Sequence, residues 1–204
     1  MAASDGTRLQ VGARIPPRTL TSITGERISV PDARGLVHLQ FRRFAGCPVC
    51  NLHLHSYAQR HAEIVAAGVR EVVLFHSSAR QLRRYASDLP FTIVGDPGKQ
   101  LYREFGVEAS LRALLHPRAV LPIVRAVAHS MGEILRGARP MPPLLRPEGG
   151  RFGLPADFLV DRDGVIRACH YGAHVDDQWS VDEMLERAAE ARERPQSARV
   201  ATGG

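Results

Sequence analysis

The chain has 204 residues, 44% of them hydrophobic, which is enough to bury the core of one globular domain. Its net charge of +6 does not indicate a nucleic-acid-binding surface, because the basic residues are scattered and only 6% of the residues are aromatic. Three cysteines are too few for a disulfide scaffold, and the first ten residues lack the apolar run of an export signal. We therefore expect a cytoplasmic protein that does not bind nucleic acid.

The most lipid-like stretch covers residues 119–135, AVLPIVRAVAHSMGEIL. Arg125, His129 and Glu133 interrupt it, so the sequence predicts no membrane span. The pattern favours an amphipathic helix instead. Such a helix would pack against the domain, at a partner or, as the least favoured option, at a membrane surface.

Strands and helices alternate in the first half of the chain. The run LVHLQFR predicts a strand over 36–42, and apolar residues at three- and four-residue spacing predict a helix over 48–67 that Gly68 ends. The same patterns predict strands over 70–75 and 91–95 and helices over 79–87 and 98–105. This alternation is typical of parallel pairing in a layered α/β sheet.

The alternation stops where a long insertion begins. Residues 108–150 hold the lipid-like stretch and then the segment ARPMPPLLRPEGG, whose prolines cannot continue a helix. After it, the pattern predicts two strands, over 157–160 and 165–170, joined by a hairpin turn over 161–164. A charged helix over 176–192 closes the domain.

These boundaries define the expected organisation of the chain. We predict one domain over 10–192 with the insertion 108–150 inside it. Residues 1–9 and 193–204 are expected to be flexible ends, since they carry few apolar residues that could tie them down.

Two cysteines follow the first predicted strand, in the stretch FRRFAGCPVC. If the helix begins near Pro48, Cys47 lies at its N-cap and Pro48 at its first position, where the missing N–H costs nothing. Unpaired backbone N–H groups and the positive end of the helix dipole then favour the thiolate of Cys47. Arg42 and Arg43 are close enough in sequence to add positive charge.

Cys50 lies one helical turn after Cys47 and on the same face of the helix. It is close enough to attack a mixed disulfide or a sulfenic acid formed at Cys47, and we expect the helix to shield its sulfur more. A CxxC pair that follows a strand and opens a helix is typical of a redox site.

Two other interpretations of the pair stay open. A zinc site needs four ligands, and the sequence lacks the second CxxC or histidine pair that such sites carry. His53 and His55 follow closely but lie on different sides of the helix. An inert structural pair is the second alternative, although buried structural cysteines rarely stand at a helix N-terminus. We predict a redox pair and no bound metal.

Five stretches of the chain are informative together: VGARIPPRTLTSITGERISV, LVHLQFRRFAGCPVC, EVVLFHSS, LPFTIVGDPGKQLYREFGV and LPADFLVDRDGVIRACHYG. They resemble the peroxiredoxin-like group of the alkyl hydroperoxide reductase and thiol-specific antioxidant family, a branch of the thioredoxin-fold superfamily. The resemblance covers about residues 11–179, with only a loose match over 108–150. Its most specific parts are the stretches around GCPVC and DPGKQLYREFG.

The resemblance implies a thioredoxin-like α/β fold: a central mixed sheet flanked by helices, with the helical and proline-rich insertion before the last two strands. It implies that Cys47 is the attacking thiol and Cys50 its partner, with Pro48 and Arg43 supporting the site. It places Pro155, in GLPADF, at a proline that is cis in thioredoxins and faces the CxxC pair. An ordinary trans proline at a strand start is the alternative.

The sequence departs from the main peroxiredoxin pattern at the groups that orient a peroxide. The expected Thr three residues before the reactive cysteine and the Pro seven residues before it are here Phe44 and Gln40. The expected substrate-orienting arginine aligns with Pro155, so Arg43 or Arg42 would have to supply its charge. The site therefore looks more like that of a thioredoxin.

Five further residues stand out by type and place. Cys169 lies in a predicted strand, where a lone cysteine is most often a small buried hydrophobe. Asp96, in VGDPGK, is expected to cap the helix that follows. His76, His170 and His174 fall near the sheet edge where α/β sites collect, although each is more often a core or solvated histidine.

These patterns predict a thiol oxidoreductase that reduces peroxides or disulfides and needs no bound cofactor. Its partners would be that substrate and a dithiol reductant such as thioredoxin, and a homodimer is one assembly to consider. Two alternatives remain. One is a thioredoxin-fold carrier of copper or zinc that uses Cys47 and Cys50, and the other is a non-catalytic module that assembles through the helix over 119–135.

Overall fold

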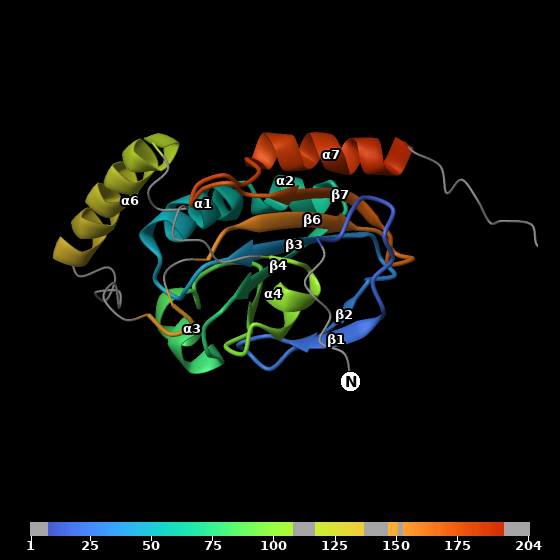
Figure 1. Cartoon of the computed structure of the whole chain (residues 1–204), viewed down its shortest axis with the longest axis horizontal. Coiled ribbons are helices and arrows are strands. Elements are labelled where there is room, and N and C mark those ends of the chain that lie inside the picture. Colours follow the sequence, from blue (N-terminus) through green and yellow to red (C-terminus); the bar gives the residue numbers. More distant parts are fainter. Residues whose placement is uncertain (1–7, 108–116, 137–146, 151–152, 194–204) are drawn as a thin grey trace, which may run out of the picture.

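The computed structural model describes residues 8–107, 117–136, 147–150 and 153–193. Five strands form its central sheet in the order β5-β4-β3-β6-β7 (Figure 1). The first three strands are parallel: β3 (Leu36–Arg42), β4 (Val69–Phe75) and β5 (Thr92–Gly95). The last two, β6 (Ala156–Val160) and β7 (Ile166–Tyr171), are antiparallel to their neighbours. The predicted α/β fold with a central mixed sheet is confirmed.

A hairpin near the N-terminus forms a second, two-stranded sheet from β1 (Arg18–Thr21) and β2 (Arg27–Val30). These two strands are not among the elements that the sequence analysis predicts. Ile28 and Val30 are fully buried and alternate with exposed neighbours, which is the period of a half-buried strand. A run of four residues is too short for that period to be recognised from the sequence alone.

Six helices are described: α1 (Pro48–Gln59), α2 (His61–Ala66), α3 (Ala79–Tyr85), α4 (Gln100–Glu104), α6 (Pro117–Leu135) and α7 (Val181–Glu193). The single helix predicted over 48–67 is two helices, because the backbone leaves helical geometry at Arg60 (φ −107°). The closing helix begins at Val181 rather than 176. Ser180 and Glu183 exchange the reciprocal hydrogen bonds of a capping box there, which fixes the start.

The helices and the hairpin cover opposite faces of the sheet. In Figure 1, α1, α2 and α7 lie on one side of the sheet, and the β1–β2 hairpin and α4 lie on the other. Side chains of both layers meet the sheet in buried apolar clusters. One cluster joins Tyr57, Ile64 and Met184 to the first face, and another joins Ile28 and Phe105 to the second. Apolar side chains therefore pack against both faces of the sheet.

The predicted hairpin between the last two strands is present. Gly164 has a φ of +80°, and the Asp161 carboxylate accepts hydrogen bonds from the backbone N–H groups of Asp163 and Val165. Aspartate and glycine are the residues that such turns favour.

The expected insertion is described only in part. Within 108–150, α6 contains the predicted helix over 119–135, whereas 108–116 and 137–146 lie outside the described residues. The expected flexible ends also fall on undescribed residues, apart from 8–9 and 193, so the organisation into one domain with an insertion stays a prediction. Among the described residues, no helix is long and apolar enough to cross a membrane.

Candidate thiol redox site

The two cysteines lie where the carboxyl end of β3 passes into α1. Cys47 is the N-cap residue of α1 and Pro48 occupies its first turn, as the sequence predicts. The turn before them needs Gly46, whose φ is +79°. The backbone N–H of Cys50 donates a hydrogen bond to Cys47 Sγ at 3.5 Å. The thiol of Cys47 thus takes the capping position that a serine or aspartate oxygen fills in most helices.

The surroundings of Cys47 favour its thiolate. Burial alone would raise the pKa of this thiol. A hydrogen bond from the Cys50 side chain, the positive charge of Arg43 and the backbone N–H groups of Cys50 and Val49 outweigh burial and lower the pKa to about 6. With such a pKa, about nine-tenths of Cys47 is thiolate at pH 7.

Cys50 has the opposite character. Its Sγ donates a hydrogen bond to Cys47 Sγ across 2.9 Å. Burial, this hydrogen bond and the nearby Cys47 charge raise the pKa of Cys50 well above its ordinary value. Both cysteines are free thiols, since a disulfide would bring the sulfurs to about 2.05 Å. The pair therefore consists of one thiolate and one thiol that are already in contact.

Neither sulfur is exposed. Cys47 is 1% exposed and Cys50 2%, so the expectation that Cys50 would be the more shielded is wrong. The reason is that α6 and the loop before α1 cover the N-terminus of the helix, which a sequence-based view of α1 alone leaves open. Both cysteines belong to one apolar cluster together with Phe44, Ala45, Val49, Leu54, Phe75 and Ala126.

The two arginines before the cysteines point in different directions. Arg43 Nη1 donates to Cys47 Sγ at 3.6 Å, and its guanidinium lies 5.4 Å from the centre of the Phe44 ring. Arg43 is thus the cation of the thiol site. Both arginines are buried, but successive residues at the end of a strand face opposite sides, so Arg42 points away from the thiols.

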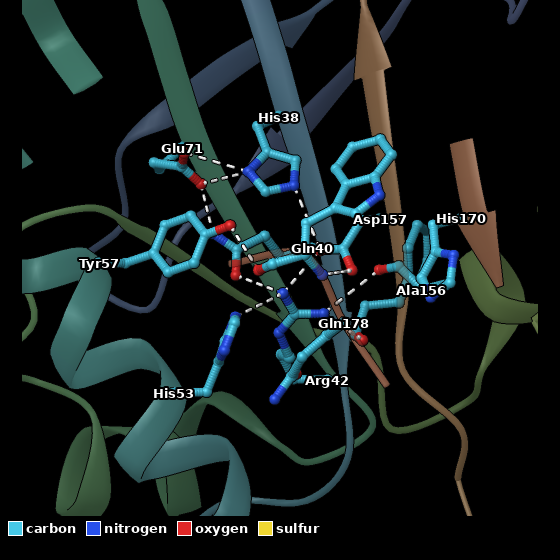
Figure 2. Close-up of polar contacts among 12 residues, drawn as sticks. His38, Gln40, Arg42, His53, Tyr57, Glu71, Ala156, Asp157, His170 and Gln178 are labelled. Carbon is cyan, nitrogen blue, oxygen red and sulfur yellow. Dashed lines mark hydrogen bonds and ion pairs between the residues drawn. The ribbon is translucent and has the colours of Figure 1, made fainter. Parts of the chain in front are cut away.

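Arg42 enters a buried polar network beneath α1 (Figure 2). Its Nη2 donates to Asp157 Oδ1 at 2.6 Å and to Gln40 Oε1 at 2.7 Å. His38 continues the network, with its Nε2 3.2 Å from Asp157 Oδ1 and its Nδ1 2.9 Å from Glu71 Oε2. Gln40 Nε2 also donates to Glu71. Side chains from the neighbouring strands β3, β4 and β6 are thereby joined on one face of the sheet.

Ionised groups in this network stabilise one another. Burial would lower the pKa of His38, but Glu71 and Asp157 raise it to about 9, so the ring is an imidazolium at neutral pH. Burial would raise the pKa of Asp157, but Arg42 and His38 hold it well below its usual range. Fully buried charges of this kind persist only when they are paired.

The network reaches α1 through His53. Arg42 Nη2 lies 3.3 Å from His53 Nε2, and the His53 ring packs against Tyr57 one turn later in α1. Burial, followed by the charge of Arg42, lowers the pKa of His53 well below its usual value, so this ring is neutral. The sequence analysis missed the network. Polar residues at 38, 40 and 42 share one face of β3, and that alternation was the available signal.

His76 was one of three histidines placed near this edge of the sheet, and it is almost completely buried. Its backbone N–H donates to the Arg43 carbonyl at 3.1 Å, so it lies beside the thiol site. Neither ring nitrogen has a hydrogen-bond partner among the described residues. Burial, together with the positive charge of Lys99, lowers the pKa of His76 to about 4, so the ring is neutral at pH 7. Gly149 and Gly153 pack directly against the ring.

Pro155 differs from its prediction. Among the described residues the cis peptide bond is Val30–Pro31, so the expectation of a cis bond before Pro155 is wrong. Pro155 stands directly before β6, its carbonyl accepts a hydrogen bond from Gly172, and its ring packs against that glycine. It is an ordinary trans proline that extends the pairing of β6 with β7, the less costly geometry for such a bond.

Cys169, Asp96 and His170 make packing or hydrogen-bond contacts within the fold. Cys169 packs against the apolar cluster on the other face of the sheet, and burial raises its pKa. Asp96 caps α4, since its carboxylate accepts hydrogen bonds from the N–H groups of Gln100 and Leu101, as predicted. His170 Nε2 lies 2.9 Å from Asp177 Oδ1.

A cavity of about 530 Å³ lies at the opposite edge of the sheet, where β3, β4 and β5 begin. Asp32, Arg70, His61 and Phe91 are among its lining residues, and neither cysteine of the CxxC pair is. Within the described ranges, no group of three or more His, Cys, Asp or Glu side chains is placed to hold a metal ion.

Comparison with solved structures gives the same fold. The chain is similar to the peroxidoxin BcpB from Mycobacterium tuberculosis (14% identity, TM-score 0.61, 92% of this chain and 99% of that one). It is also similar to a putative thiol:disulfide interchange protein DsbE from Chlorobium tepidum (21% identity, TM-score 0.53, 90% of this chain and 97% of that one). A third similar structure is that of a cysteine-to-serine mutant of peroxiredoxin 6 from Arenicola marina (13% identity, TM-score 0.64, 90% of this chain and 74% of that one). The thioredoxin-like fold expected from the resemblance is confirmed.

Sequence comparison gives the family. No curated protein sequence matches the chain. The family model described as "AhpC/TSA family" matches residues 11–169, which is more than half of the chain and includes both cysteines of the CxxC pair. The chain belongs to the AhpC/TSA family.

Proposed function

We propose that the protein is a thiol oxidoreductase of the peroxiredoxin-like type, in which Cys47 attacks a peroxide or a disulfide and Cys50 resolves the product. The observation that carries this proposal is the contact between the two sulfurs, 2.9 Å apart, with pKa shifts of opposite direction. Attack and resolution require one sulfur that is a thiolate in the reduced protein and a second sulfur that stays a thiol until the first has reacted. Membership of the AhpC/TSA family supports it.

The reaction with a hydroperoxide balances without a cofactor. The Cys47 sulfur forms a bond to the terminal oxygen, which keeps its proton, as the O–O bond breaks, and the alkoxide takes a proton from water and leaves as an alcohol. Cys47 becomes a sulfenic acid. Cys50 then loses its proton, its sulfur bonds to the Cys47 sulfur, and water leaves. The hydroperoxide is reduced, and the dithiol is oxidised to an intramolecular disulfide.

The reaction with a disulfide substrate uses the same two sulfurs. Cys47 attacks one sulfur of the substrate and forms a mixed disulfide, and the other substrate sulfur leaves as a thiol. Cys50 then attacks Cys47 and releases the second substrate thiol. In either case an external dithiol such as thioredoxin takes up the oxidising equivalents and restores the pair. A homodimer is compatible with this cycle, which needs only one chain.

The opposite pKa shifts support the proposed redox pair, because the surroundings lower the pKa of Cys47 and raise that of Cys50. A zinc carrier would need further ligands beside the two sulfurs, and among the described residues no group of three or more His, Cys, Asp or Glu side chains is placed to supply them.

Thiol trapping tests the proposal directly. The reduced wild type, Cys47→Ser and Cys50→Ser are mixed with hydrogen peroxide, cumene hydroperoxide or hydroxyethyl disulfide, quenched in acid and alkylated after unfolding. The wild type should close the Cys47–Cys50 disulfide, Cys50→Ser should accumulate a sulfenic acid or mixed disulfide, and Cys47→Ser should stay reduced. Cys169→Ser is the matched control and should behave as the wild type. An unreactive wild type, or an equally reactive Cys47→Ser, would contradict the proposal.

A further inference from the structure

The cavity of about 530 Å³ where β3, β4 and β5 begin has no part in the proposed function. We call it the strand-start cavity. The CxxC pair stands at the other end of β3, where the chain passes into α1, and neither of its cysteines lines the cavity. Cavities of about 300–1,000 Å³ are typical of sites that bind small molecules. The strand-start cavity thus has the size of a binding site and is separate from the thiols.

Much of the wall of the strand-start cavity is apolar. Phe91 and His61 both line it, and their ring centres lie 6.0 Å apart with the ring planes tilted by 57°. Aromatic rings favour further rings as neighbours at such distances. The aliphatic residues of the lining include Leu36, Val65, Val69, Leu89 and Ile93.

Val65 shows that this apolar wall is open. It is 55% exposed, although its neighbour Ile64 in α2 is fully buried. Among the described residues outside α6, only Val65 and Val11 are large apolar side chains with such exposure. A ligand in the cavity would remove the Val65 surface from water, which favours binding.

The charged groups at the mouth of the cavity compensate one another. Asp32 Oδ2 accepts hydrogen bonds from Arg34 Nη2 at 2.7 Å and from Arg70 Nη1 at 3.0 Å. The Nη2 of Arg70 donates to Glu26 Oε1 at 2.7 Å. Two arginines and two carboxylates therefore form one chain of ion pairs with no net charge.

Glu71 is the remaining carboxylate of the lining, and it too is paired. Its two oxygens lie 3.1 and 2.9 Å from Nδ1 of His38, which is an imidazolium at neutral pH, and Gln40 also donates to it. A charged ligand would have to break one of these pairs or remain unpaired against an apolar wall, and both are costly. An uncharged ligand needs neither.

We propose that the strand-start cavity binds an uncharged small molecule that carries an aromatic ring. The paired charges and the aliphatic wall select against a charged ligand, and the rings of Phe91 and His61 favour a flat one. The proposal does not rest on the proposed function, since a ligand at this place meets neither sulfur of the CxxC pair.

An NMR titration of the full-length, ¹⁵N-labelled protein tests the proposal. Three probes share one ring system: at pH 7, 2-naphthamide is uncharged, 2-naphthoate is anionic and 2-naphthylmethylamine is cationic. We expect 2-naphthamide to give saturable shifts of the backbone amides in 61–71 and 86–93, and both charged probes to bind at least fivefold more weakly. Equal affinity for the three probes would overturn the ligand class. The absence of saturable shifts in these two ranges would overturn the site, as would shifts confined to α6.

A pair of valine variants tests the wall. Val65→Asp places an unpaired carboxylate in the lining, so it should weaken the binding of 2-naphthamide about tenfold and make the cationic probe the tightest ligand. Val11→Asp is the matched control, because Val11 is 54% exposed and does not line the cavity. It should leave all three affinities unchanged. Equal effects of the two substitutions would overturn the proposal.

Asp32→Asn tests the compensation of charge. It leaves Arg34 and Arg70 without their shared carboxylate, so the anionic probe should gain at least fivefold over 2-naphthamide relative to wild type. Asp163→Asn removes an exposed carboxylate outside the cavity and should change neither affinity. No gain in folded Asp32→Asn would overturn the claim that paired charges select an uncharged ligand. If circular dichroism shows that Asp32→Asn is unfolded, the valine pair decides, since both valines are exposed.

Discussion

Cys50 Sγ donates its hydrogen bond to Cys47 Sγ across 2.9 Å, so the thiol of Cys50 also stabilises the thiolate of Cys47. One proton is held between two sulfurs of very different acidity. This relationship makes the reduced pair chemically asymmetric before any substrate arrives, and it can be measured.

The acidity of Cys47 should depend on its partner. In wild type, thiolate absorbance at 240 nm should rise with a midpoint near pH 6. Cys50→Ala removes the donated hydrogen bond, so the pKa of Cys47 should rise by about one unit or more. Cys169→Ser, whose thiol lies on the other face of the sheet, should leave the midpoint unchanged. A midpoint above pH 8 in wild type would contradict the assignment.

Arg43→Met should also raise the pKa of Cys47, because it removes the cation 3.6 Å from the sulfur. A rise of about one unit would lower the thiolate fraction at pH 7 from about nine-tenths to about half. Arg43→Lys should shift the pKa less, since it keeps the charge. Arg34→Met, at an exposed arginine far from the thiols, is the matched control. Identical titrations of Arg43→Met and wild type would exclude this role for Arg43.

Asp157→Asn should strongly destabilise the protein, because it leaves Arg42 and His38 as buried cations without their shared carboxylate. Removing one partner of a buried ion pair typically costs about 3–5 kcal/mol of unfolding free energy. Urea denaturation measures the loss. Asp163→Asn, at an exposed position in the β6–β7 turn, should cost under about 1 kcal/mol. Equal midpoints for the two variants would show that the network does not stabilise the fold.

His38 should make stability depend on pH in the alkaline range. Its pKa is raised in the folded protein, to about 9, so its contribution is complete below its unfolded pKa of about 6.5 and is lost as pH rises through about 9. The unfolding free energy should fall by about 3 kcal/mol over this range from this group. The difference between wild type and His38→Gln in urea titrations at pH 6, 7.5 and 9 isolates the contribution. A difference that grows with pH would have the wrong sign.

His76→Phe should change the unfolding free energy by less than about 1 kcal/mol, since neither ring nitrogen has a hydrogen-bond partner among the described residues. The ring space is retained by phenylalanine. Urea denaturation checks this, and a loss above about 2 kcal/mol would show that a hydrogen bond to the ring matters. His53→Phe is a contrasting variant, because it removes a partner of Arg42 and should cost more.

The sequence predicts those parts of the site whose geometry depends on residues that are adjacent in the chain. Cys47, Pro48 and Gly46 determine the start of α1 through local backbone geometry, and the Asp161 turn follows from the preference of aspartate and glycine for tight turns. Such features involve only a few adjacent residues, so their chemistry can be inferred without the rest of the fold.

The parts that were missed depend on residues far apart in the chain. In the sequence, His38, Gln40 and Arg42 are polar residues in an otherwise apolar strand and have no evident partners. Their partners come from other strands, Glu71 from β4 and Asp157 from β6. The burial of Cys47 likewise depends on α6, about 80 residues later in the chain. No pattern within GCPVC predicts which residues cover Cys47 in the folded protein.

That cover has a kinetic consequence. Because the residues Cys47 and Cys50 are only 1% and 2% exposed, a molecule larger than water can meet Cys47 only after the wall beside it opens locally. Under the proposed function, turnover would then follow the rate at which Ala126 and its neighbours move away from α1, and not the intrinsic reactivity of the Cys47 thiolate.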